Sequence, residues 1–239
     1  MPAAKAQEAC RFVTIGSASV RAASEAGIAL DDGRIVRLAG VELPENAQPA
    51  PPAGTPVVLK RLGARETDRY GRLVAHVFVG EDGGGERWFQ AELVRTGLAR
   101  VSARFGDTAC ARALLGEELA ARTAKLGLWG EPYYVINKAE DPAGVLKSRG
   151  RFALVEGKVE SVRESGGTIY VNFGRRWSED FTVTIAKRNE RVFSAAGLEP
   201  KSLTGRRVRI RGWIEERGGP WVEAARPEQI EVVQERSGN

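Results

Sequence analysis

The sequence predicts an α+β protein, mainly β, made of two small β barrels in tandem. Short apolar segments separated by Gly, Pro and Asp turns recur in both halves of the chain. Helix-forming segments follow the fifth strand in the first half and the third strand in the second half. The length of 239 residues is enough for two such domains, and 42% hydrophobic with 28% charged residues is typical of globular proteins.

The first block, from about residue 13 to 129, begins with five predicted strands. Asp32-Gly33 between two alternating runs predicts a hairpin turn. The segment 46–56 contains four prolines, which exclude a regular helix there. The predicted strands lie at 12–16, 27–30, 34–41, 56–62 and 72–79.

Two helices are expected to complete this block. Residues 87–97 place Phe89, Leu93 and Val94 on one helical face and end at Gly97, a suitable residue for the position after a helix. Residues 107–129 are rich in helix formers. Asp107 or Thr108 is the expected N-cap, and Gly127 is the expected end.

The second block follows a polar connector. Its segments predict three strands, a helix and two more strands, at 152–164, 168–174, 180–186, 190–197, 206–216 and 220–233. This is the chain order of a five-stranded OB barrel. We therefore expect a first domain at 1–131, a linker at 132–149 and an OB-like domain at 150–235.

The net charge of +5 and the pI near 9.4 are compatible with a nucleic-acid partner without requiring one. No apolar run approaches 18 residues, so no membrane span is expected. The first ten residues lack the apolar core of a signal peptide. The compartment stays open: cytoplasmic, or exported if a signal lies outside this sequence.

The cysteines and the histidine give little sign of a metal site. Cys10 and Cys110 fit no metal-binding spacing and are either two buried thiols or one disulfide, which would imply an oxidising compartment. The one histidine, His76, lies within a predicted strand and is interpreted as a strand-face residue rather than a catalyst. A single histidine also argues against a histidine-based catalytic triad.

Four segments of the first block, in order, resemble the thermonuclease (staphylococcal nuclease-like) family. They are "DDGRIVRLAGVELPE", "DRYGRLVAHVFV", "AELVRTGLARV" and "LLGEELAARTAKLGLW", and together they span about residues 20–130. The resemblance implies an OB-like barrel with helices and cleavage of phosphodiester bonds in DNA or RNA, usually with calcium.

By motif, the resemblance makes Arg37, Glu45 and Arg72 catalytic and Glu42 a metal ligand. A guanidinium stays charged and can hold two phosphate oxygens as negative charge develops on them. A carboxylate beside the phosphorus can orient or deprotonate water. Ca²⁺ would offset further charge. Arg69 and Tyr70, in the same segment as Arg72, are expected to contact nucleic acid.

The sequence also departs from the family pattern. Ala26 stands where the family has a calcium-binding aspartate, and only the neighbouring Glu25 offers a replacement carboxylate. Two stacking tyrosines of some members fall at Ala103 and Phe105, so Phe105 is the remaining aromatic candidate. Two hypotheses follow: a nuclease with weakened or altered calcium dependence, or a degraded nuclease fold that binds nucleic acid or a protein.

The second block offers its own basic tract. In "RRVRIRG", Arg207, Arg209 and Arg211 alternate with apolar residues and so share one strand face. Aromatic residues are interleaved nearby, and exposed bases could stack on them while arginines follow the phosphates. The alternative is a solvated arginine face with the aromatic residues in the barrel core.

Overall fold

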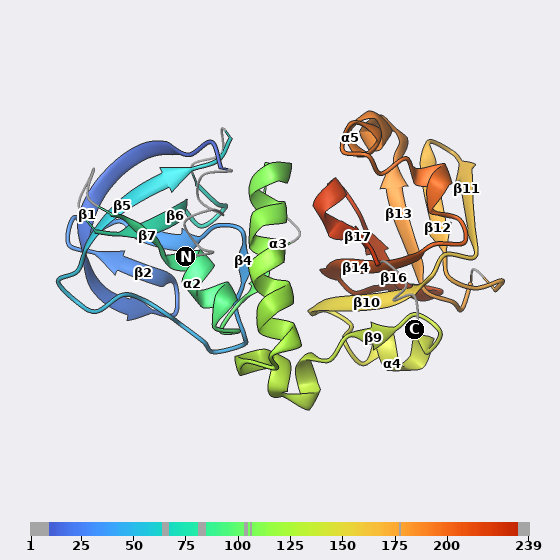
Figure 1. Cartoon of the computed structure of the whole chain (residues 1–239), viewed down its shortest axis with the longest axis horizontal. Helices are drawn as coiled ribbons and strands as arrows, with labels where there is room; N and C mark the ends of the chain where they lie inside the picture. The colour runs from blue at the N-terminus through green and yellow to red at the C-terminus, as the bar shows by residue number, and fades with distance from the viewer. Residues whose placement is uncertain are drawn as a thin grey trace. The chain divides into compact units, whose positions relative to one another are not determined.

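The computed structural model describes residues 10–63, 67–80, 85–102, 105, 107–176 and 178–233. The chain divides into two compact units, Met1–Pro132 and Tyr133–Asn239 (Figure 1). Each unit has its own hydrophobic core. In the part of the chain that the structure describes, no helix has the length and apolarity needed to cross a membrane.

Unit 1 contains a closed ring of five strands. The ring order is β3-β2-β1-β5-β6, and a parallel pairing between β3 and β6 closes it. The predicted Asp32-Gly33 hairpin joins β2 to β3, with Ile28 opposite Val36. The strands of this unit are β1 (Val13–Ser24), β2 (Gly27–Leu30), β3 (Ile35–Leu38), β4 (Val41–Glu42), β5 (Pro56–Arg61), β6 (Leu73–Val79), β7 (Arg87–Trp88) and β8 (Arg100–Val101).

Strand β1 is much longer than the predicted 12–16 segment. Its first half pairs with β5 and its second half with β2, and register shifts occur at Thr14/Gly16 and Val20/Ala22. Such irregularities bend a strand. Because β1 bends, it can pair with both β2 and β5 in the ring, and it is the long blue ribbon in Figure 1.

Two helices follow the barrel of unit 1. Helix α2 (Phe89–Arg95) ends before Gly97, which has φ of +74°, as expected for the residue after a helix. Helix α3 (Thr108–Thr123) has Asp107 as its N-cap, accepting from the Cys110 N–H, and ends before the predicted Gly127. The short 3₁₀ helices η1 (Gly127–Gly130) and η2 (Pro132–Tyr134) come next.

A disulfide joins Cys10 to Cys110, so the second of the two alternatives for the cysteines holds. It ties the chain before β1 to the first turn of α3. His76 lies on β6, and its side chain is buried in an aromatic cluster with Phe12 and Trp88.

Unit 2 repeats the strand connectivity of unit 1. Strands β11, β12 and β13 form a meander, and β13 pairs in parallel with β16, as β3 pairs with β6 in unit 1. Strand β10 pairs with β14 in the place of β1 with β5. The strands are β9 (Asn137–Lys138), β10 (Phe152–Lys158), β11 (Ser161–Ser165), β12 (Thr168–Asn172), β13 (Thr182–Ala186), β14 (Arg207–Trp213), β15 (Glu215–Arg217), β16 (Gly219–Glu223) and β17 (Ile230–Val232).

The helices of unit 2 are short. Helix α5 lies between β13 and β14, where the sequence predicts it. The segment expected to be a linker instead carries β9, which pairs with β10, and α4, which begins at an Asp141 N-cap. The helices are α4 (Pro142–Leu146), η3 (Lys187–Asn189), α5 (Glu190–Ala195), η4 (Pro200–Leu203) and η5 (Pro227–Gln229).

Candidate active site

The predicted catalytic arginines line one pocket of unit 1, with a volume of about 230 Å³. We call it the arginine pocket. It lies between the β1–β2 turn, strand β3 and the loop that follows β4. Its lining residues are Ser24, Glu25, Ala26, Gly27, Ile28, Val36, Arg37, Leu38, Val41, Glu42, Leu43, Ala47, Gln48, Pro49 and Arg72.

The ring closure brings Arg37 and Arg72 together. Strands β3 and β6 run parallel, with Val36 opposite Leu73 and Arg37 opposite Val74. Arg72, which precedes β6, therefore reaches the same pocket as Arg37 from the neighbouring strand. Arg37 is exposed and makes no hydrogen bond or ion pair with any residue that the structure describes, so its charge is available to a ligand.

Arg72, in contrast, is fixed by the protein. Its Nε and Nη2 lie 2.8 and 2.7 Å from Oδ2 of Asp68, and its Nη1 donates to the Ala26 carbonyl oxygen at 3.0 Å. Asp68 Oδ1 also accepts the N–H groups of Tyr70 and Arg72, which holds the turn between them. A guanidinium has five N–H donors, so two remain for a ligand.

The pKa of Asp68 is lower than its ordinary value of 3.8. Burial raises this pKa, but the Arg72 side chain and the backbone N–H groups of Tyr70 and Arg72 outweigh burial because they stabilise the carboxylate. Asp68 is therefore ionised at neutral pH and keeps Arg72 oriented. Sequence reasoning missed Asp68, although an aspartate at the start of a Gly-containing turn is a recognisable turn signal.

Tyr70 lies beside this ion pair as an exposed aromatic ring, 66% accessible. The guanidinium carbons of Arg69 and Arg72 are 4.7 and 5.3 Å from its ring centroid. Arg69 Nη2 also donates to the Tyr70 hydroxyl at 2.5 Å. The ring and two cations form one surface next to the arginine pocket, with a composition suited to a base or sugar beside a phosphate.

The three predicted carboxylates differ in their surroundings. Glu45 is exposed without a partner among the described residues, on a loop whose Leu43 and Ala47 line the pocket, although Glu45 itself is not a lining residue. Glu25 is exposed at the pocket edge. Glu42 Oε1 instead accepts from the Ser102 hydroxyl at 2.8 Å. Glu42 is therefore held by the protein, while Glu25 and Glu45 are exposed to solvent.

The arrangement agrees with a comparison against known families. Residues 35–131 match the family model described as staphylococcal nuclease homologue. This part of unit 1 is a staphylococcal nuclease-like domain. A comparison of the chain with curated proteins found no match.

The pocket of this nuclease-like domain is poor in side-chain ligands for a calcium ion. Ca²⁺ takes six to eight oxygen ligands, whereas the pocket lining offers two carboxylates, Glu25 and Glu42. The Ala26 carbonyl is already bonded to Arg72, so a cation there would meet a guanidinium. Within the described ranges, no three His, Cys, Asp or Glu residues form a metal-binding group.

The predicted stacking residue Phe105 is a core residue of the nuclease-like domain. It is 6% exposed, and its ring packs over Gly40, where a Cβ would come within 2.4 Å of it. The ring therefore has no free face for a base, and we leave it out of the proposed site. Ala103 lies outside the described residues.

The arginine tract of unit 2 shares one face of β14, as the alternation predicts, but its charges are neutralised within the unit. Arg209 lies 2.7 Å from Glu156 on β10 and 3.6 Å from Glu231 on β17. Arg211 is fully buried and also pairs with Glu231, while Arg207 lies 3.6 Å from Glu156. These ion pairs engage the arginines that the sequence offered as phosphate contacts, so we do not include the tract in the proposed site.

Proposed function

We propose that the nuclease-like domain binds and hydrolyses phosphodiester bonds of DNA or RNA in the arginine pocket, without a tightly held calcium ion. The observation that carries this proposal is the entry of Arg37 and Arg72 into one pocket from two neighbouring strands. Arg72 is held in place and Arg37 is free of partners among the described residues, so together they offer a fixed and an adjustable donor to one phosphate.

The residues have complementary tasks in this mechanism. The phosphate gains negative charge as water attacks phosphorus, and the two guanidinium groups stabilise that charge through hydrogen bonds. The P–O bond to one sugar then breaks, and the leaving sugar oxygen takes a proton from solvent. Glu45 orients the attacking water and takes its proton, since it is exposed on the loop that lines the pocket. Tyr70 and Arg69 hold the adjoining nucleotide on the surface beside the pocket.

The second candidate is a domain that binds nucleic acid without cutting it. The bond from Arg72 Nη1 to the Ala26 carbonyl favours this candidate, because it occupies a donor that a transition state would otherwise use. Ala26, which accepts this hydrogen bond, is also the position at which the family has a calcium-binding aspartate. Binding and cutting must therefore be measured separately.

Cleavage of single-stranded and plasmid DNA and of RNA, with Ca²⁺, with Mn²⁺ and with chelator, tests the hydrolytic proposal. We expect cleavage in chelator, reduced roughly 100-fold or more by Arg37→Ala, Arg72→Ala or Glu45→Gln. Arg95→Ala is the matched control because Arg95 is an exposed arginine on α2 outside the pocket.

Absence of cutting under every condition, combined with oligonucleotide binding at low salt that Arg37→Ala weakens, would favour the binding-only candidate. Cutting that Arg72→Ala leaves unchanged would overturn the proposed site. Cutting only with Ca²⁺ would overturn the calcium-free mechanism but not the role proposed for Arg37 and Arg72.

A further inference from the structure

The connection between β4 and β5 forms one wall of the arginine pocket. We call residues 46–55 of this connection the proline loop, because three of them are prolines. Ala47, Gln48 and Pro49, three consecutive residues of the loop, line the pocket that also holds the two proposed phosphate-binding arginines. The proline loop therefore borders the place where the scissile phosphate is proposed to bind.

Gln48 is the one neutral polar side chain of the described pocket lining that is not bonded within the protein. The other neutral polar side chain, that of Ser24, donates its Oγ–H to the Gly27 carbonyl oxygen at 2.7 Å. Gln48 is exposed, and its amide makes no hydrogen bond with any residue that the structure describes. It thus offers a carbonyl acceptor and two N–H donors to a molecule in the pocket.

A tight turn fixes the start of the proline loop. The Ala47 N–H donates to the Pro44 carbonyl oxygen at 3.1 Å, and Asn46 between them has φ of +66°. A positive φ at the third residue alone is the pattern of a type II turn, in which Gly and Asn are favoured at that place. The turn therefore sets the direction in which the backbone enters the pocket wall at Gln48.

Prolines, core packing and backbone bonds fix the rest of the loop. Pro51 is buried, and Ala50 packs against the hydrophobic core of unit 1. The Gly54 N–H donates to the Val20 carbonyl oxygen at 2.7 Å, which joins the loop to β1. Because proline holds φ near −65°, the three prolines leave the loop few other conformations. Gln48 is therefore presented on a backbone of defined shape, as a side chain that distinguishes between ligands must be.

The chemistry of a nucleotide assigns Gln48 to the base rather than to the phosphate. The charged phosphate is bound by the two guanidinium groups, and phosphate contacts carry no sequence information. A nucleobase instead presents neutral donors and acceptors side by side, and the amide of glutamine matches the N6–H donor and N7 acceptor of adenine. Ala47 and Pro49, which flank Gln48 in the pocket lining, offer apolar contacts to the flat face of such a base.

We propose that Gln48 is a specificity-determining residue that hydrogen-bonds an adenine base beside the phosphate held by Arg37 and Arg72. This inference rests on the proposed function, because it needs nucleic acid in the arginine pocket. It needs binding and not cutting, so it applies to the binding-only candidate as well. The ring of Tyr70 does not supply such selectivity, since stacking on an aromatic ring tolerates every base.

Binding and cleavage of single-stranded dA, dT and dC decamers and of an rA decamer by the full chain test the proposal. Fluorescence anisotropy at low salt gives Kd, and cleavage gives kcat/KM. We expect the wild type to favour the dA decamer over the dT and dC decamers by roughly 5- to 100-fold. Gln48→Ala should abolish this preference, and so should Gln48→Met, which has a side chain of similar length without the amide.

Asn46→Gly is the matched control. It removes an exposed amide two residues away on the same loop, outside the described pocket lining, and glycine accepts the positive φ of this position. The preference for the dA decamer should therefore be unchanged in Asn46→Gly. Gln48 is exposed, so its variants are expected to fold, and thermal unfolding of each variant checks this.

The proposal is overturned if the wild type does not favour the dA decamer, or if Gln48→Ala keeps the wild-type preference. A change in the ratio of rA to dA in Gln48→Ala, with the preference among the DNA decamers unchanged, would show that Gln48 contacts the 2′-hydroxyl and would also overturn it. Failure of the proposed function gives a different result, in which the wild type neither binds nor cuts any decamer, and that result overturns both.

Discussion

At the scale of single residues, Asp68 shows how a side chain outside the pocket can control one inside it. It contacts Arg72 through one carboxylate oxygen and the turn backbone through the other. The family resemblance identified Arg72 from its motif, but the geometry of its guanidinium depends on this neighbour four residues earlier. We infer that Asp68 is a positioning residue for the proposed reaction.

Replacing Asp68 with asparagine should therefore lower the turnover rate more than substrate binding. The amide oxygen of the new side chain could still accept from the turn, but the charge that orients Arg72 is lost, so we expect kcat to fall roughly 10- to 100-fold. Steady-state cleavage kinetics would show KM nearly unchanged. A loss of activity in Asp68→Asn that only follows its loss of thermal stability would instead indicate a folding role.

His76 is the other residue with a distinctive chemistry. Its side chain is enclosed by Phe12, Trp88 and Phe105, and its Nδ1 has no hydrogen bond in the described structure. Burial lowers its pKa to about 3. The ring is therefore neutral at physiological pH and acts as a core aromatic residue, in keeping with the interpretation that it is not a catalyst.

Protonation of His76 in the unfolded state should make the first unit acid-sensitive. Since the folded pKa is below the ordinary 6.5, the unfolded chain binds the extra proton first, and stability falls as the pH drops below 6.5. The limiting slope is about 1.4 kcal/mol per pH unit. Urea unfolding at pH 7, 6 and 5 should show this loss in the wild type and not in His76→Phe; parallel curves for both would contradict the assignment.

At the scale of elements, the strands with clear apolar alternation were predictable, while β1 was not. The segment from Ser17 to Ser24 is made mostly of small and polar residues, so little in it signals a strand beyond residue 16. The neighbours β2 and β5 hold it extended through backbone pairing. The ion pairs of β14 were equally hidden, because their carboxylates come from β10 and β17 rather than from β14 itself.

The contact between the end of α2 and the segment after α3 depends on two glycines. A Cβ on Gly97 would lie 2.2 Å from the Leu126 carbonyl oxygen, and one on Gly127 would lie 2.5 Å from the Gly97 carbonyl oxygen. The Leu128 N–H donates to that same Gly97 oxygen at 2.9 Å. The two backbones therefore approach more closely than any side chain would allow, which fixes α3 against α2.

Gly97→Ala should destabilise unit 1 by roughly 2–4 kcal/mol, because a backbone clash adds to the strain of a positive φ. Gly54→Ala is the control, since Gly54 has φ of +81° but open space around its Cβ position. Thermal unfolding of both variants separates the two effects. A smaller loss of stability in Gly97→Ala than in Gly54→Ala would contradict the close approach of Gly97 to the Leu126 carbonyl oxygen.

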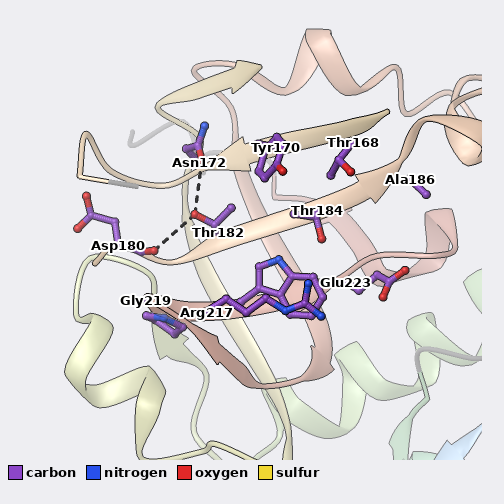
Figure 2. A pocket seen from close by; sticks show the side chains of 12 residues that line it. Thr168, Tyr170, Asn172, Asp180, Thr182, Thr184, Ala186, Arg217, Gly219 and Glu223 are labelled. Carbon is purple, nitrogen blue, oxygen red and sulfur yellow. Dashed lines mark hydrogen bonds between the residues drawn. The ribbon is translucent and has the colours of Figure 1, made fainter. Parts of the chain in front are cut away.

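At the scale of the whole molecule, the two units have similar orders of strand pairing, but their pockets have different linings. Among the described residues, the lining of the arginine pocket carries two arginines and two glutamates, whereas the pocket over β12 and β13 (Figure 2) carries one arginine, one aspartate and one glutamate. The five-stranded ring of unit 1 followed from the order of apolar segments in the sequence. The pocket over β12 and β13 could not be foreseen, since its lining depends on the register between β12, β13 and β16.

The disulfide should stabilise unit 1 alone, because both cysteines belong to it. Closing a loop of about 100 residues is worth roughly 4–5 kcal/mol in the chain-entropy description. Calorimetry of the Cys10→Ser, Cys110→Ser double variant should show a lower unfolding temperature for unit 1 and an unchanged one for unit 2. A lower unfolding temperature for both units would indicate that they unfold together.

The same bond turns the chain between residues 10 and 110 into a covalent ring that contains the whole barrel of unit 1. A protease that cuts this ring once opens it without releasing a fragment. The nicked protein would migrate at full mass on a denaturing gel without reductant and split into two pieces when reductant is added. The disulfide would therefore keep the two parts of the unit 1 barrel connected after a single backbone break. Unit 2 contains no cysteine, so only its packing would hold its parts together after such a break.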